Sequence, residues 1–240
     1  MLIEDLNIII KSYTYYLKKN FSVNQESDLE GYNLDDIEDQ IFGSISILPY
    51  FLRISEEECS YVHFDNIFDC LGYYQKREGE NVEGEIVLNK KCIENYALDL
   101  KQKGFNLKSR IYPFPYNECV FKIVLFHELG HWITHWMLDK DSKRWGDDFW
   151  EITPNPNDLL DGLAQLFTYQ AILIDPDFKN LKILFEIMLT GQTDPYHQHS
   201  TILKHKNFSW YNVFNALAEI RLESNPTLDS FLNKFNQNPE

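Results

Sequence analysis

The chain has 240 residues, enough for one domain with a substantial hydrophobic core. Hydrophobic residues make up 44% and charged residues 25% of the chain, which is typical of a globular protein and not of a disordered one. The formal net charge of −15 argues against a nucleic-acid-binding surface, because an acidic protein has few cations with which to displace counterions from phosphates.

The sequence also argues against a membrane partner or a secretory signal. No stretch reaches the roughly 18 apolar residues that a membrane-spanning helix needs. The first acidic residues of the N-terminus precede its first basic one, which is the reverse of a secretory signal. The four cysteines (Cys59, Cys70, Cys92 and Cys119) are widely spaced and form no Cys-x-x-Cys pair. We therefore expect reduced, mostly buried thiols and a cytoplasmic location.

Strands are expected in the first half of the chain, after an N-terminal helical extension over residues 1–43. Apolar residues recur at helical spacing over 4–19 in this extension. Runs rich in β-branched and aromatic residues predict strands at 44–53, 60–64, 70–75 and 84–89. The last two flank the polar segment KREGENVEG, which is typical of a hairpin or a mobile loop. The sequence thus predicts a small, mainly antiparallel sheet.

Helices are expected in the second half. Apolar residues at helical spacing indicate them, and capping signals such as Asn155 followed by Pro156 mark their ends. They cover 91–103, 117–138, 155–174, 177–190 and 209–222, and a short last helix starts at Asn225. Strands followed by helices are typical of an α+β fold. We expect a single domain over residues 1–240, with its core at 44–175 and a helical C-terminal subdomain at 176–240.

The segment FKIVLFHELGHWITHWM, residues 121–137, contains an HExxH motif in an otherwise apolar helix. His127 and His131 lie one helical turn apart, the separation from which two imidazoles can hold one tetrahedral zinc ion. Glu128 lies about 100° around the helix from His127, where a carboxylate can act as the general base toward a metal-activated water. The alternative is an amphipathic core helix whose histidines form hydrogen bonds elsewhere.

A catalytic zinc site needs a third protein ligand. His135 is two turns from His127, too far along the axis to share its metal, so we expect it to support the site or to pack. The next helix offers Asp161, a carboxylate in apolar surroundings that is costly to bury unless it is paired or bound to a metal. Asp158 lies in the first helical turn, where the helix dipole already explains it. Glu151 precedes the helix and is a weaker choice.

The segment HELGHWITH, followed about 30 residues later by D-x-x-A-Q-L-F, resembles the small gluzincin metallopeptidases of the ImmA/IrrE kind, which carry HExxHxxxH and then E-x-x-A-N/Q. LGYYQ…GEIVLN is similar to the strand pair of those proteins. The resemblance implies a minimal zincin-like domain whose sheet packs on the HExxH helix. It makes His127, His131 and Asp161 the zinc ligands and Glu128 the catalytic base. Aspartate replaces the usual glutamate, so its helix must approach the metal more closely.

The expected function is that of a zinc-dependent endopeptidase acting on a specific protein or peptide substrate. The resemblance adds a regulatory role in a stress or phage-related response. Tyr196 and His197, in the polar segment TDPYHQHS between two helices, are expected to stabilise the oxyanion of the reaction. The strand at 84–89 is expected to form the rim of the cleft and to pair with an extended substrate. The alternatives are an inactive zincin-fold scaffold protein and a zinc hydrolase of a non-peptide amide.

Overall fold

The fold was analysed in a computed structural model. It describes residues 52–57, 67–76, 84–103, 115–136, 157–175, 178–220, 222–223 and 226–235. The N-terminal extension at 1–43 and the strand expected at 60–64 lie outside these ranges, as does Glu151.

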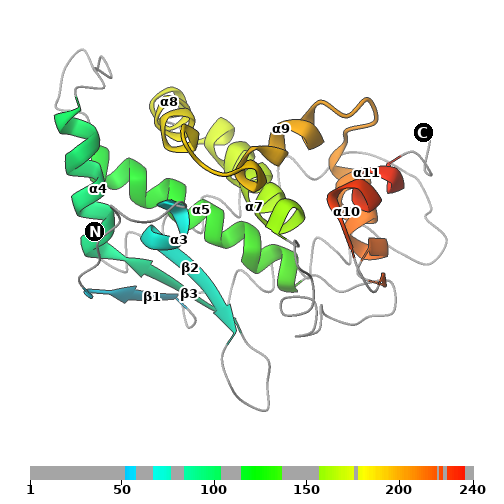
Figure 1. Ribbon diagram of the computed structural model, residues 1–240, viewed down its shortest axis with the longest axis horizontal. Helices are drawn as coiled ribbons and strands as arrows, with labels where there is room; N and C mark the ends of the chain where they lie inside the picture. The colour runs from blue at the N-terminus through cyan, green and yellow to red at the C-terminus, as the bar shows by residue number, and fades with distance from the viewer. Residues whose placement is uncertain are drawn as a thin grey trace.

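Strands and helices follow one another as an α+β fold (Figure 1). The first half holds β1 (Leu52–Ser55), α3 (Ile67–Leu71), β2 (Gly72–Lys76), β3 (Gly84–Asn89) and α4 (Lys90–Gln102). The second holds α5 (Tyr116–Trp136), α7 (Asn157–Ile174), α8 (Phe178–Leu189), η3 (Asp194–His197), α9 (Gln198–Leu203), α10 (Trp210–Ile220) and α11 (Leu228–Lys234). The prediction of an α+β fold with a helical C-terminal half is confirmed.

The sheet has three described strands in the order β1-β3-β2. β2 and β3 are antiparallel, as their position around KREGENVEG indicates, but β1 runs parallel to β3. The sheet is therefore mixed, and the prediction of a mainly antiparallel sheet is wrong in this respect. β3 lies in the middle with a partner on each side, so it cannot offer its edge to a substrate as expected. The outer strands of the described sheet are β1 and β2.

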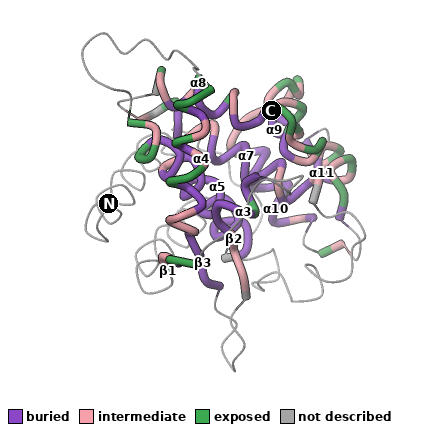
Figure 2. The backbone as a smooth tube through the Cα atoms, turned by 60° about the vertical axis from the view of Figure 1, so that its left-hand side comes forward, coloured by how far each residue is buried: buried purple, intermediate pink, exposed green. Residues whose placement is uncertain are grey.

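The sheet packs on α5, as the sequence predicts. Three residues of β3, Ile86, Val87 and Leu88, are fully buried. Gly72 of β2 lies against α5, because a Cβ added there would stand 2.7 Å from a methyl carbon of Val124. α5 is buried on nearly all sides from residue 119 to 135, which is typical of a central helix and not of a surface helix. Figure 2 shows the buried backbone gathered where α3, α5 and α7 meet.

Two short segments differ from the prediction. Cys70 and Leu71, expected in a strand, belong to α3, and four of the five residues of this helix are buried. The polar segment TDPYHQHS, expected as a loop, forms η3 and the start of α9. Tertiary burial decided both cases: Tyr196 and His199 of this segment are buried, although its composition is that of a surface loop.

The cysteines correct another expectation. Cys92 is disulfide-bonded, so the prediction of reduced thiols is wrong for this residue, and a reducing compartment loses that support. Cys70 and Cys119 are buried thiols, and burial, aided by the neighbouring Asp69 carboxylate, raises the pKa of Cys70 to about 11. Within the described part of the chain, no helix combines the length and the apolar character that would let it span a membrane.

Candidate metal centre

The site lies where α5 and α7 cross at very short range. Gly130 of α5 faces Ala164 of α7, and a Cβ at position 130 would stand 2.6 Å from the Cα of Ala164. Only glycine fits at this position without moving a helix, because the obstacle is backbone and not a flexible side chain. The sequence requires such an approach if Asp161, which is one methylene shorter than glutamate, is to reach a metal on α5.

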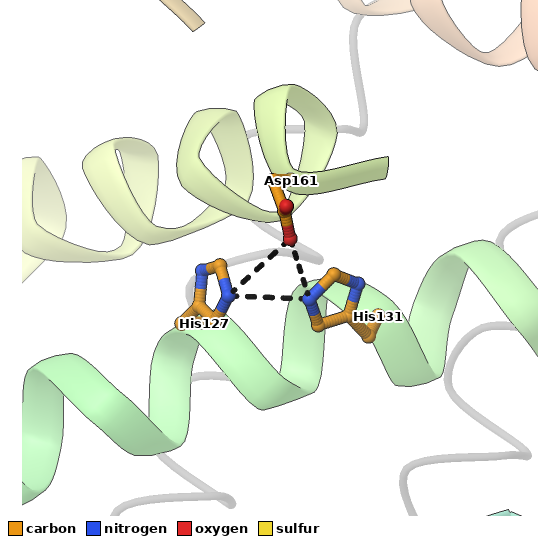
Figure 3. Close-up of side chains that lie close together, drawn as sticks. All are labelled: His127, His131 and Asp161. Atoms are coloured by element: carbon orange, nitrogen blue, oxygen red, sulfur yellow. Dashed lines mark hydrogen bonds and ion pairs between the residues drawn. The ribbon is translucent and has the colours of Figure 1, made fainter. Parts of the chain in front are cut away.

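Three donor atoms converge at this crossing (Figure 3). The Nε2 atoms of His127 and His131 are 3.1 Å apart. The Oδ1 atom of Asp161 is 3.4 Å from Nε2 of His131 and 4.0 Å from Nε2 of His127. A zinc ion bound tetrahedrally at about 2.0–2.1 Å from each donor would hold the donors roughly 3.3 Å apart. The three residues form a largely buried group that could bind a metal ion.

The electrostatics of His127 suit metal ligation. His127 is 1% exposed, and burial, with the nearby His131, holds its pKa well below the usual value. A metal binds the neutral imidazole, so a histidine that resists protonation keeps its lone pair available. Two imidazole nitrogens and one carboxylate oxygen make up a donor set that suits zinc. The residues present therefore fit the ion that the sequence predicts.

Glu128 lies beside this group and is 2% exposed. Burial raises its pKa well above the usual value, and the carboxylates of Asp69 and Asp161 raise it further. A buried carboxyl next to negative charges readily holds a proton, which is the property of a group that takes up and returns protons in catalysis. Glu128 is thus a buried carboxyl next to the metal ligand candidate His127, in an environment that favours its protonated form.

Two further polar residues near the site, His135 and the alternative third ligand Asp158, do not join the group. His135 is buried, and its Nδ1 atom forms a hydrogen bond with the hydroxyl of Tyr74 in β2. It therefore links α5 to the sheet, in line with the packing or supporting role expected of it. Asp158 stands in the first turn of α7 and is not part of the metal group.

The two residues expected to stabilise an oxyanion lie in different places. Tyr196 is buried, and its ring stacks on the imidazole of His127 with centroids 5.6 Å apart. Its hydroxyl donates a hydrogen bond to Oδ1 of Asp69 at 2.9 Å. His197 is exposed, and its Nε2 atom donates to the backbone carbonyl of Gln192. The structure brings Tyr196, and not His197, to the metal group, because successive residues of a tight turn point in different directions.

Sequence reasoning missed the contribution of α3. The ring of Phe68 is 4.9 Å from the ring of His127 and stacks on Tyr196, while Asp69 accepts the hydrogen bond of Tyr196. No sequence signal marks these two residues, since their contacts join segments that are 59 to 128 residues apart.

Sequence reasoning also left out Gln165, which stands one turn after Asp161 in the D-x-x-A-Q motif. It is fully buried, and neither polar atom of its side chain has a hydrogen-bond partner within the described ranges. A buried amide of this kind requires a polar partner such as water. The sequence signal that could have pointed to Gln165 was its place in the D-x-x-A-Q motif.

The candidate metal centre thus consists of two long helices that carry His127, Glu128, His131 and Asp161, and two short elements, α3 and η3, that cover one side of it. Comparison of the chain with family models, with curated proteins and with solved structures gives no match.

Proposed function

We propose that the protein is a zinc-dependent endopeptidase of the small gluzincin type. The observation that carries the proposal is the convergence of two imidazole nitrogens and one carboxylate oxygen beside the buried carboxyl of Glu128. The resemblance of HELGHWITH and D-x-x-A-Q to the ImmA/IrrE peptidases supports the same conclusion. It also suggests a single protein substrate and a regulatory role.

Three protein donors are the number typical of a catalytic zinc site, whereas a structural zinc site has four. A zinc ion supplies Lewis acidity: it polarises a carbonyl and lowers the pKa of a water molecule to about 7. His127, His131 and Asp161 would hold the ion. Their spacing supports a site with one position left for water or substrate.

Glu128 is proposed as the general base. It takes the proton of the attacking water and returns it to the leaving amine, for which its raised pKa is suited. A scaffold protein with a structural zinc has no need for a buried carboxyl at this position. Leaving it there costs stability, because an ionised carboxylate is unfavourable in a buried site. The presence of Glu128 therefore favours an enzyme over the scaffold alternative.

The test begins with metal content. Elemental analysis after purification without chelators should find about one zinc ion per chain, and His127→Ala should lose it. Glu128→Gln should keep the zinc and abolish hydrolysis, because it retains the shape of the side chain and removes the base. A metal-free protein that takes up no added zinc would contradict the proposal.

Substrate class is tested by digestion of a peptide library with and without chelator. Chelator-sensitive cleavage that disappears in Glu128→Gln establishes the peptidase. Hydrolysis of small acyl amides in the absence of any peptide cleavage would favour the non-peptide alternative.

A further inference from the structure

The Nδ1 atom of His127 is a buried polar atom that the metal group does not use. His127 presents its other nitrogen, Nε2, to His131 and Asp161. Its Nδ1 atom is buried and has no hydrogen-bond partner among the residues that the structure describes. Phe68 and Tyr196 contact the imidazole through their rings, with centroids at 4.9 and 5.6 Å, and so supply no acceptor. An acceptor for Nδ1 must therefore come from another direction.

Metal ligation makes this acceptor important. A neutral imidazole carries one proton, so a metal bound through Nε2 leaves that proton on Nδ1 of His127. A buried N–H without an acceptor loses the hydrogen bond that it would otherwise form with water. Metal-bound histidines almost always donate this second N–H to a carboxylate, a carbonyl or a water molecule. The partner of Nδ1–H therefore contributes to the affinity of His127 for the ion.

Gln165 offers polar atoms on the facing helix. It stands one turn after Asp161 and next to Ala164, the residue that lies against Gly130. Its side chain is fully buried, and neither Oε1 nor Nε2 has a partner in the described part of the chain. In Figure 3, α7 continues from Asp161 over His127, and the Nδ1 edge of the imidazole faces this helix. Each helix thus carries, at the same crossing, a buried polar group that needs a partner.

The remaining buried polar side chains of α5 and α7 have other contacts or directions. Thr134 and Thr168 each donate to the backbone carbonyl one turn before them. Glu128 points about 100° around α5 from His127, and the last histidine of the helix is bonded to β2. Gln165 is therefore the residue of these two helices whose side chain is left to satisfy Nδ1–H.

A water molecule is the bridge that suits the two groups. No direct hydrogen bond joins Nδ1 of His127 to Gln165, so a polar contact between them needs a molecule in between. Water accepts from Nδ1–H and donates to the amide oxygen Oε1. Buried waters in proteins typically bond to polar groups that would otherwise be unsatisfied.

We propose that one buried water molecule links Nδ1–H of His127 to the amide of Gln165, and that Gln165 thereby positions His127 for the metal. The inference adds a water site and a positioning residue to the site. It rests on the metal centre of the proposed function and not on the identity of the substrate.

The first test measures zinc affinity and requires no turnover. Gln165→Met keeps an unbranched side chain and removes the amide, so zinc affinity should fall by about tenfold, the lower end of the loss caused by removal of an outer-shell partner. Gln165→Glu restores an acceptor and should recover most of the affinity. Competition with a fluorescent zinc chelator gives both values. The urea midpoint of metal-free Gln165→Met should not fall, because an apolar side chain replaces a buried amide.

Asn215→Leu is the matched control. Asn215 of α10 is also a buried amide, and its Oδ1 atom has no partner within the described residues. Leucine has nearly the shape of asparagine, so this variant also replaces a buried amide by an apolar side chain. It lies on a helix that carries none of the candidate ligands and should keep the zinc affinity of the wild type.

The second test is a crystal structure of the zinc-loaded wild-type protein, which depends on no variant. It should show a water molecule within about 3.2 Å of both Nδ1 of His127 and the amide of Gln165. Nδ1 bonded to anything other than this water would overturn the inference.

The zinc measurements separate the inference from the function on which it rests. Equal affinities of the wild type and Gln165→Met, or an equal loss in Asn215→Leu, would overturn the role of Gln165 and leave the ligand set intact. Wild-type affinity in His127→Ala would show that the metal centre itself is wrong, and the water link would fall with it.

Discussion

The two sides of the metal centre are built in opposite ways. One side is the crossing of α5 and α7, two long buried helices that meet at Gly130 and Ala164 and carry the metal donors. The other is the pairing of α3 with η3, two elements of five and four residues held by a few side-chain contacts. The long helices fix the chemistry through close packing, whereas the short elements add an exposed charge. Damage to the first should abolish metal binding, and damage to the second should leave metal binding in place.

The largest effect is expected from separating the long helices. Gly130→Val places methyl groups against the backbone of Ala164, so α5 and α7 must move apart. The free energy of unfolding should fall by about 3 kcal/mol, as for other overpacked cores, and zinc binding should be lost. Urea denaturation and elemental analysis measure the two effects.

Gly191→Ala is the control for this experiment, because its added Cβ meets nothing within 4 Å, although its φ of +87° disfavours alanine. It should cost about 1 kcal/mol and leave zinc content unchanged. Normal zinc content in Gly130→Val would show that the close helix crossing is not needed for the site.

The second effect concerns the third donor. Asp161→Ala removes one of three ligands, so zinc affinity should fall by more than the roughly 10–100-fold that the loss of an outer-shell partner costs. Asp158→Ala, one turn earlier on α7, should retain the wild-type affinity. Competition with a fluorescent zinc chelator measures both. Equal losses in the two variants would mean that α7 as a whole, and not the Asp161 carboxylate, supports metal binding.

A third, smaller effect is a pH dependence of stability at η3. Nδ1 of His199 donates to the backbone carbonyl of Tyr196, and burial lowers the pKa of this histidine in the folded protein. Below about pH 6.5 the unfolded chain therefore binds more protons than the folded protein. The contribution of His199 to the free energy of unfolding is full above that pH and decreases as the pH falls. His199→Gln should flatten the decrease between about pH 7.5 and 5.5. Denaturation in chelator excludes metal release, and an unchanged slope would contradict this assignment.

The smallest effect is expected at His197. It is exposed and hydrogen-bonds to the backbone of Gln192, so His197→Ala should change the free energy of unfolding by less than about 0.5 kcal/mol. Zinc content should also stay the same. A clear loss of turnover at normal zinc content would restore the oxyanion role that the sequence suggested for this residue.

Local periodicity was enough to predict the parts of the site that lie on long helices. The spacing of His127, Glu128 and His131 fixes their directions as soon as the segment is helical, and the length and apolar content of 117–138 predict a helix. Asp161 was marked by its apolar surroundings. The tertiary structure brought its Oδ1 atom to 3.4 Å from His131, and the pairing of Gly130 with Ala164 is the reason.

The remaining features depended on contacts between segments far apart in the chain. A parallel pairing of β1 with β3 has no sequence signature, because strand patterns look alike in both orientations. The hydrogen bond of Tyr196 to Asp69 joins residues on opposite halves of the chain, and Asp69 carries no local signal. The sequence by itself determined the helices and the relative directions of His127, Glu128 and His131, since 3.6-residue periodicity acts locally. Only the tertiary structure decided which carboxylates face them, because that depends on how closely the backbones can approach.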